Sequence, residues 1–169
     1  MEDNRQLVYK DTLSPVGLIR LIASSDGLVA ILWESEDYQR TKLPIPAQAD
    51  DNAILLQTEQ QLKEYFNKER TAFNVPLDLK GTEFQVKVWE ALLKIPFGTT
   101  RTYGELARLL GDIKAVRAVG GALNKNPVSI IVPCHRIVGA SGLVGFAGGL
   151  RNKAILLDLE QIHKAPTLF

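Results

Sequence analysis

Nine residues, Ile130–Val138, constrain this chain more than any other stretch. They set the only cysteine of the sequence, Cys134, between two short apolar runs that are rich in β-branched residues. Such runs are typical of buried strands, so we expect rigid, buried neighbours on both sides of the cysteine. Pro133 has a fixed φ and no N–H group to donate, which favours a sharp change of chain direction just before the sulfur.

A histidine and an arginine, His135 and Arg136, follow the cysteine directly. They offer a titratable base and a permanent cation, and both are costly to bury unless they have a partner. A lone cysteine in apolar surroundings is usually a small core residue with an unreactive sulfur. The polar pair beside it favours a reactive thiol at Cys134 instead.

The cysteine count and the hydropathy of the chain exclude several classes of protein. A single cysteine cannot form an intrachain disulfide or a cysteine-rich zinc site, and it is compatible with a reducing compartment. We find no residue cluster that requires a metal or another cofactor. No apolar run approaches the roughly 20 residues of a membrane-spanning helix, and the first residues lack a signal-peptide pattern. We therefore expect no membrane contact and an intracellular location, the cytoplasm or, in a eukaryotic cell, the nucleus.

Charged residues are divided unevenly along the chain. Residues 1–79 carry 8 Lys and Arg against 13 Asp and Glu, whereas residues 80–169 carry 12 against 6. The basic half also contains Cys134. An excess of positive charge of this kind suits a polyanionic partner. We predict two domains, a structural one over residues 1–79 and a second over residues 80–169 that carries the thiol.

The first domain has the pattern of a β-meander followed by a helix. Asp26-Gly27 is a strong hairpin signal, and Pro76 limits the segment around it to the edge of a sheet. Alternating apolar residues predict the other strands, and apolar residues at helical spacing predict the helix. The expected elements are strands at residues 7–10, 18–23 and 28–33, a loop at 34–50, a helix at 51–67 and an edge strand or linker at 71–79.

Two capping boxes mark the starts of helices in the second domain. Thr82 opens a predicted helix that runs to Lys94, and Thr102 opens a shorter one that stops at Gly111. A further helix is expected at residues 114–123. Two short helices joined by a three-residue turn containing glycine form a helix-turn-helix, a motif that also occurs in proteins that never touch DNA.

The second helix of this pair is expected to expose small residues. A helix that recognises base edges in the major groove would carry long polar side chains there. Its two adjacent glycines cost about 1 kcal/mol each relative to alanine. Small residues allow close approach to a narrow surface such as the minor groove of DNA, with Arg117 as the one long projection. Packing against another helix is the alternative. The predicted exposed face consists of Ala115, Arg117, Ala118, Gly121 and Ala122, next to Gly120.

The run Pro133-Cys134-His135-Arg136-Ile137 resembles the signature of the O6-alkylguanine-DNA alkyltransferases. The similarity covers essentially all of residues 80–169, and residues 1–79 resemble the family in layout. It implies an α+β protein with an N-terminal ribonuclease-H-like α/β domain and a mostly helical C-terminal domain with a winged-helix-like helix-turn-helix. Beyond the signature, the similar segments are Tyr103, residues 117–122, Asn126-Pro127, residues 145–149 and residues 156–160.

The resemblance also implies an activity. Such a protein repairs DNA by moving an alkyl group, such as methyl, from O6-alkylguanine irreversibly to its own cysteine, so one molecule repairs one lesion. O4-alkylthymine is a further candidate substrate. The implied partner is double-stranded DNA, bound at the minor groove by a monomer that flips the damaged base out, with no cofactor.

Four residues would carry the transfer according to this resemblance. An ordinary cysteine, with a pKa of about 8.5, is only a few per cent ionised at neutral pH, so the thiol needs activation. Glu160 would orient His135, and His135 would draw the proton of Cys134 through a water molecule. Tyr103 would protonate, or hydrogen-bond to, the purine as it leaves.

Further residues receive roles in the same way. Asn126 matches the hinge that joins the helix-turn-helix to the active segment, and Arg117 would fill the space that a flipped base vacates. The residues assigned to DNA contact are Thr102, Ala115, Arg117, Ala118, Gly120, Gly121 and Ala122. Those assigned to the substrate pocket and hinge are Asn126, Arg136, Ile137, Ser141, Val144, Gly145, Phe146 and Gly148.

The chain departs from the family pattern at several positions around the pocket. Phe146 stands where tyrosine is frequent, Ala147 where some members have serine, and Ser129 where some have a second proline. Gln161 follows Glu160 where glycine is common. None of these changes affects the nucleophile, so they bear on which alkyl groups fit.

Three other classes of protein are open on the residues alone. A cysteine peptidase needs a histidine beside its thiol, but adjacent side chains of an extended chain point opposite ways, which leaves only His163. A non-catalytic lesion-binding relative replaces the cysteine that this chain keeps. A helix-turn-helix regulator is less consistent with the small residues of the second helix.

Overall fold

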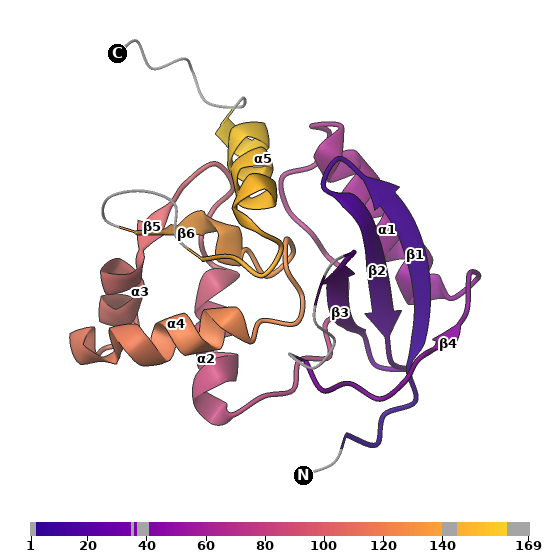
Figure 1. Ribbon diagram of the computed structural model, residues 1–169, viewed down its shortest axis with the longest axis horizontal. Coiled ribbons are helices and arrows are strands. Elements are labelled where there is room, and N and C mark those ends of the chain that lie inside the picture. Colours follow the sequence, from indigo (N-terminus) through magenta and orange to yellow (C-terminus); the bar gives the residue numbers. More distant parts are fainter. Residues whose placement is uncertain (1–2, 35, 37–40, 140–144, 162–169) are drawn as a thin grey trace. The chain divides into compact units, whose positions relative to one another are not determined.

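A computed structural model describes residues 3–34, 36, 41–139 and 145–161 of the chain. The chain divides into two compact units, Met1–Lys80 and Gly81–Phe169. Figure 1 shows the strands of the first unit and the helices of the second. No helix within the described ranges is both long and apolar enough to cross a membrane.

The first unit contains a four-stranded sheet with the order β3-β2-β1-β4. The three long strands are antiparallel neighbours, whereas the short β4 pairs with β1 in parallel. The meander is confirmed, but β4 lies in the segment predicted to be a loop. The strands are β1 (Val8–Ser14), β2 (Gly17–Ala23), β3 (Leu28–Trp33) and β4 (Ala47–Gln48).

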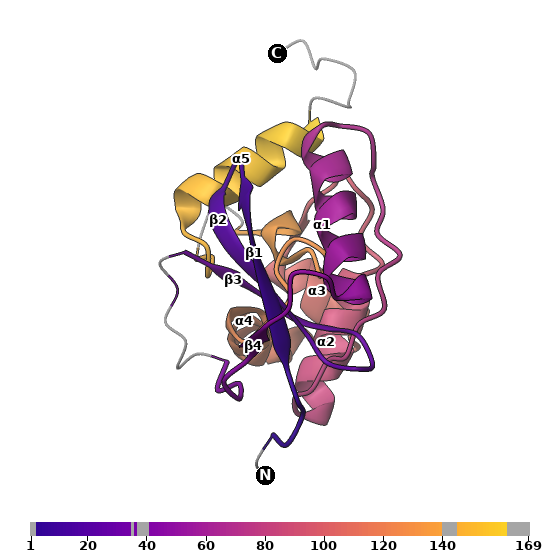
Figure 2. The ribbon, with the colours of Figure 1, turned by 90° about the vertical axis from the view of Figure 1, so that its right-hand side faces the viewer.

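Helix α1 (Ala53–Phe66) lies along one face of this sheet, as Figures 1 and 2 both show. The side chain of Asn52 caps it by accepting a hydrogen bond from the backbone N–H of Leu55 over 3.0 Å. Leu55, Leu62 and Tyr65 are buried on the helix face that the apolar spacing predicted. The helix is therefore confirmed, with a start two residues later than expected.

The hairpin at Asp26-Gly27 leads into β3, and Gly27 is required there by close approach. A Cβ atom at this position would lie 2.8 Å from the backbone carbonyl oxygen of Pro76. The adjoining Leu28 exchanges backbone hydrogen bonds with this segment, donating to Pro76 and accepting from Asp78. Residues near Pro76 thus run along the edge of the sheet, as predicted.

The second unit is mostly helical. Thr82 and Thr102 both form the predicted capping boxes, each with the side chain three residues later. Gly111 follows the last residues of α3 and begins the turn of the helix-turn-helix with a φ of +90°, which glycine adopts at little cost. Its elements are α2 (Glu83–Leu92), β5 (Arg101–Thr102), α3 (Tyr103–Leu109), the 3-10 turn η2 (Ile113–Ala115), α4 (Val116–Asn124), the 3-10 turn η3 (Cys134–Arg136), β6 (Ile137–Val138) and α5 (Leu150–Gln161).

The core of the second unit forms around Trp89 of α2, which is 1% exposed. Its indole Nε1 donates a hydrogen bond to the backbone carbonyl of Ala122 in α4 over 2.8 Å. Val88, Leu106 and Val119 are also buried. The helix-turn-helix is therefore anchored on α2 through the inner face of α4.

Candidate active site

The segment that leads into Cys134 is buried as expected, but it is not a strand. Residues 129–132 form a turn followed by a bend, and Ile130 has a φ of +78°. This left-handed conformation is unfavourable for a β-branched residue and persists only where the surrounding structure holds it. Ile130 is 1% exposed and therefore closely packed. The prediction of a strand before the cysteine is wrong, whereas the run after it does form β6.

Asn126 ties the two ends of this segment together. Its Oδ1 accepts a hydrogen bond from the backbone N–H of Val128 over 3.0 Å, and its Nδ2 donates to the carbonyl oxygen of Val132 over 2.9 Å. The same carbonyl accepts from the N–H of Cys134 over 2.8 Å. One buried amide side chain thus fixes the backbone immediately before the thiol.

Cys134, His135 and Arg136 form the 3-10 turn η3, and all three are buried. Successive residues of such a turn point about 120° apart around its axis. The turn therefore separates the three side chains. His135 and Arg136 reach Glu160 of α5, while Cys134 lines a pocket.

The carboxylate of Glu160 accepts hydrogen bonds from three residues. His135 Nε2 lies 2.6 Å from Oε2. Arg136 donates Nε to Oε1 over 2.8 Å and Nη2 to Oε2 over 3.1 Å. The backbone N–H of Gly98 donates to Oε1 over 3.2 Å. Glu160 is 1% exposed, so this group is a buried, fully hydrogen-bonded charge.

These contacts set the protonation states of the pair. Burial would raise the pKa of Glu160, but the hydrogen bonds and charges of His135 and Arg136 outweigh it and hold that pKa well below 4.5. Burial lowers the pKa of His135 below 6.5, against the opposing effect of Glu160. A neutral His135 beside an ionised carboxylate carries its proton on Nε2, which leaves Nδ1 as an acceptor. In the described part of the chain, no group hydrogen-bonds to Nδ1.

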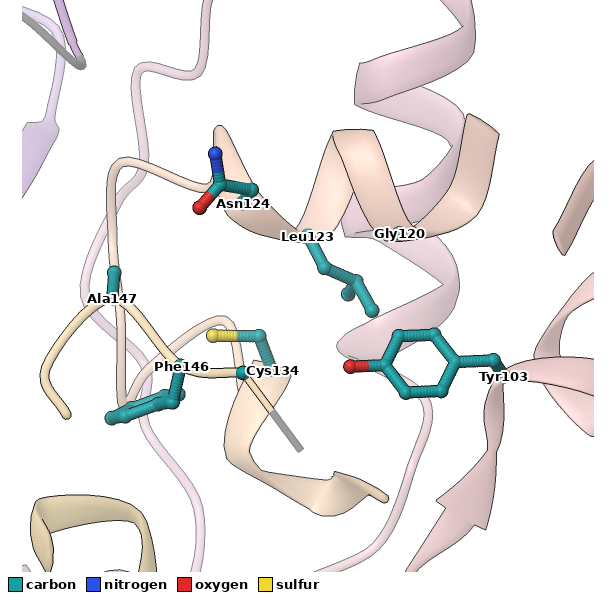
Figure 3. A pocket seen from close by; sticks show the side chains of 8 residues that line it. Tyr103, Gly120, Leu123, Asn124, Cys134, Phe146 and Ala147 are labelled. Carbon is teal, nitrogen blue, oxygen red and sulfur yellow. The ribbon is translucent and has the colours of Figure 1, made fainter. Parts of the chain in front are cut away.

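Cys134 lies at a pocket between α4, the start of α3 and the segment before α5. Figure 3 shows the phenol ring of Tyr103 with its hydroxyl directed toward Cys134, and Phe146 on the other side of the sulfur. Glycine and alanine at several positions leave the pocket open. Its lining residues are Tyr103, Gly120, Leu123, Asn124, Cys134, Gly145, Phe146 and Ala147.

Tyr103 is held at the first position of α3, directly after β5. Strand β5 pairs with β6, whose first residue follows Arg136, so the pairing links the tyrosine to the η3 turn. Burial, and then the negative charge of an ionised Cys134, raise the pKa of Tyr103 above 10.0. The hydroxyl therefore keeps its proton at neutral pH and can donate it.

The predicted face of small residues is only partly present on α4. Arg117, Ala118 and Gly121 are exposed, and Gly120 lines the pocket. Ala122 is 2% exposed, so its predicted exposure is wrong: it faces α2, where its carbonyl accepts from Trp89. Ala115 belongs to the η2 turn rather than to the helix, and Thr102 caps α3.

The other residues predicted for the pocket are dispersed. Gly145 and Phe146 line it. Arg136 and Ile137 are buried, but neither is among the described lining residues, because Arg136 is directed to Glu160. The carbonyl of Gly148 accepts a hydrogen bond from Asn152 in the first turn of α5. Ser141, Val144 and His163 lie outside the described residues.

Lys153 belongs to the site and is absent from the sequence prediction. It is 1% exposed, and its Nζ donates to the backbone carbonyl of Ile137 over 2.6 Å. Burial lowers its pKa, and a negative charge on Cys134 opposes that shift. The available signal was its spacing, since Lys153 lies on the same helical face as Leu156, Leu157 and Glu160.

Comparisons with known proteins identify the family of this chain. The model of the 6-O-methylguanine DNA methyltransferase DNA-binding domain matches residues 83–162, and that of the ribonuclease-like domain of the same proteins matches residues 7–79. The chain belongs to the 6-O-methylguanine DNA methyltransferase family. The predicted membership and the predicted fold class are both confirmed.

Relatives in this family are similar over nearly their whole length. The methylated-DNA–protein-cysteine methyltransferase of Mycobacterium leprae is 44% identical over 159 residues, covering 92% of this chain and 94% of the relative. That of Methanosarcina acetivorans is 45% identical over 149 residues, covering 87% and 94%. The crystal structure of the Mycobacterium tuberculosis protein in complex with DNA superimposes with a TM-score of 0.84 at 42% identity, covering 92% of this chain and 93% of that one.

Proposed function

We propose that this methyltransferase repairs DNA by taking the alkyl group of O6-alkylguanine onto Sγ of Cys134, once per molecule. One observation supports this activity above the others. The sole cysteine lies at a pocket, directly beside a histidine that a buried, ionised carboxylate orients. Similar proteins that are named for this reaction, and one solved with DNA, agree with the proposal.

The thiol must first lose its proton, because a thiolate is the effective nucleophile. Nδ1 of His135 is the proposed acceptor, reached from Sγ of Cys134 through a water molecule. Glu160 remains ionised and stabilises the imidazolium that results, as an orienting carboxylate does in other nucleophilic sites. The proposed role of Glu160 is to orient His135 rather than to take the proton itself.

The transfer then makes one bond and breaks one. A bond forms between Sγ of Cys134 and the alkyl carbon, while the bond from that carbon to O6 breaks and its electron pair stays with the guanine. The purine gains negative charge as it leaves. The Tyr103 hydroxyl, which keeps its proton at neutral pH, donates it or a hydrogen bond to the purine.

Contact with DNA is proposed for the exposed face of α4. Ala118 and Gly121 permit close approach to the minor groove, and the exposed Arg117 is long enough to enter the base stack. The O6 atom of guanine lies at the major-groove edge, so a protein bound at the minor groove reaches it only if the base is flipped out. We expect the protein to act as a monomer in the compartment that holds the DNA.

The test is to incubate the protein with an oligonucleotide that carries one O6-methylguanine and to weigh the intact protein. We expect a single methyl adduct, mapped to Cys134 by peptide analysis, with no second turnover. Cys134→Ala is the matched control and should bind the oligonucleotide without clearing the lesion. Removal of the methyl group by Cys134→Ala would exclude this mechanism.

A further inference from the structure

Glu160 has more partners than a residue that only orients a histidine needs. Among the hydrogen bonds that its oxygens accept, one comes from His135, two come from Arg136 and one comes from the backbone of Gly98. The guanidinium matches the carboxylate with two nearly parallel bonds, which is the strongest geometry for such a pair. The carboxylate of Glu160 is therefore shared between His135 and the permanently charged Arg136.

Arg136 is itself held rigidly. Its Nη1 donates to the carbonyl oxygen of Ile95 over 2.7 Å, and its guanidinium carbon lies 5.8 Å from the centre of the Phe97 ring. The side chain is 8% exposed. Gly98 lies in the turn after α2, Arg136 lies in the η3 turn and Glu160 lies in α5. The hydrogen bonds from Gly98 and Arg136 to Glu160 therefore join these three segments at one carboxylate.

The charges of this cluster decide which form of His135 is stable. Glu160 carries one negative charge and Arg136 one positive charge, so the pair is neutral without the histidine. A proton on His135 would add a second positive charge to a buried group. Arg136 and Lys153 both oppose that charge, while Glu160 favours it.

We propose that Arg136 is a positioning residue that neutralises Glu160 and so keeps His135 as a neutral base with Nδ1 open. The inference rests on the proposed function and adds a role to it. Without the guanidinium, Glu160 would face His135 as an uncompensated anion and would favour the imidazolium. An imidazolium has no lone pair to accept the proton of Cys134. The rate of alkyl transfer would therefore fall at low pH, where His135 is protonated.

Two substitutions separate the charge of Arg136 from its shape. Arg136→Gln removes the charge and keeps a donor, whereas Arg136→Lys keeps the charge and loses the two-pronged contact. For Arg136→Gln, the transfer rate at about pH 6 relative to about pH 8 should fall by at least about threefold more than in the parent. For Arg136→Lys, the transfer rate should fall at both pH values, and the ratio of the two rates should equal that of the parent. Arg151→Lys, at an exposed position of α5, controls for loss of an arginine.

The protonation state of His135, measured with Arg136 in place, gives a second readout that does not depend on the folding of the Arg136 variants. The chain has only two histidines, so a His163→Gln protein gives a single ring in nitrogen-15 spectra. We expect His135 to be neutral with its proton on Nε2 at neutral pH. An imidazolium under those conditions would overturn the proposal.

Equal pH ratios for Arg136→Gln and the parent would also overturn the proposal, since a purely structural arginine lowers the rate without moving its pH dependence. The mass measurement on the parent protein keeps the two proposals distinct. If Cys134 gains no methyl group, the proposed function fails, while the titration of His135 with and without Arg136→Gln still reports whether Arg136 keeps the histidine neutral.

Discussion

The indole Nε1 of Trp89 lies 2.8 Å from the carbonyl oxygen of Ala122, and both residues are buried. This bond fixes the inner side of α4 while Arg117 on its outer side stays exposed. The position of the proposed DNA-contact face therefore depends on a residue that cannot touch DNA.

Trp89→Phe should destabilise the second unit. The substitution removes the N–H donor, leaves the carbonyl of Ala122 buried without that bond and reduces the packed volume. We expect a loss of about 1–3 kcal/mol in the free energy of unfolding. Urea unfolding followed by far-ultraviolet circular dichroism measures it. An unchanged midpoint would mean that α4 is anchored by its apolar contacts alone.

Acidification should destabilise the protein in two stages. The folded-state pKa of His135 lies below its ordinary value of 6.5, so the unfolded chain binds the proton first and stability falls as the pH drops below that value. The pKa of Glu160 is also depressed, so its contribution is complete above about 4.5 and is lost as the pH falls further. Thermal unfolding of the parent and of His135→Asn at several pH values tests this. The variant should lack the first stage and show a smaller second one, because Arg136 alone then lowers the pKa of Glu160.

Tyr103→Phe should slow alkyl transfer without weakening DNA binding. The phenol is the proposed donor to the departing purine, and general acid catalysis contributes about 10²-fold or more. Single-turnover kinetics on a methylated oligonucleotide, together with a binding isotherm, separate the two effects. Parallel losses of binding and rate would instead indicate a disturbed start of α3.

Arg117→Ala should slow the repair of duplex DNA by about tenfold or more, because flipping a base costs a few kcal/mol and the vacated space would be left unfilled. Reaction with the free base O6-benzylguanine needs no flipping and should hardly change, provided that base fits the pocket. Arg117→Lys should fall between, since lysine keeps the charge but loses the planar surface. Arg108→Ala, an exposed arginine of α3, controls for a general loss of charge. A matching loss on the free base would show that Arg117 supports the fold.

Local patterns in the sequence were sufficient to predict most of the helices and strands. The capping boxes at Thr82 and Thr102 and the hairpin at Asp26-Gly27 are formed by neighbouring residues, so their signals are complete within a few positions. Strand β4 was missed because two residues paired with β1 leave no periodic pattern. Its position is set by the partner strand rather than by its own sequence.

The site was less accessible to such arguments. Ile130 is β-branched and apolar, which favours a strand, yet tertiary contacts hold it at a positive φ that no local preference would indicate. Alanine is compatible with an exposed or a buried position, so the sequence alone does not place Ala122. Its contact with Trp89 of α2 buries it. The pairing of Arg136 with Glu160 spans 24 residues and depends on how α5 packs.

The η3 turn carries the thiol, the proposed histidine base and the arginine in three consecutive residues, and the proposed activation adds one group from elsewhere in the chain. That group, Glu160, lies 25 residues from His135, a short loop to close, and it belongs to the last turn of α5. Helix ends open far more often than whole domains unfold. We therefore expect the reactivity of the thiol to depend on the packing of this one helical turn, in which Glu160 is 1% exposed.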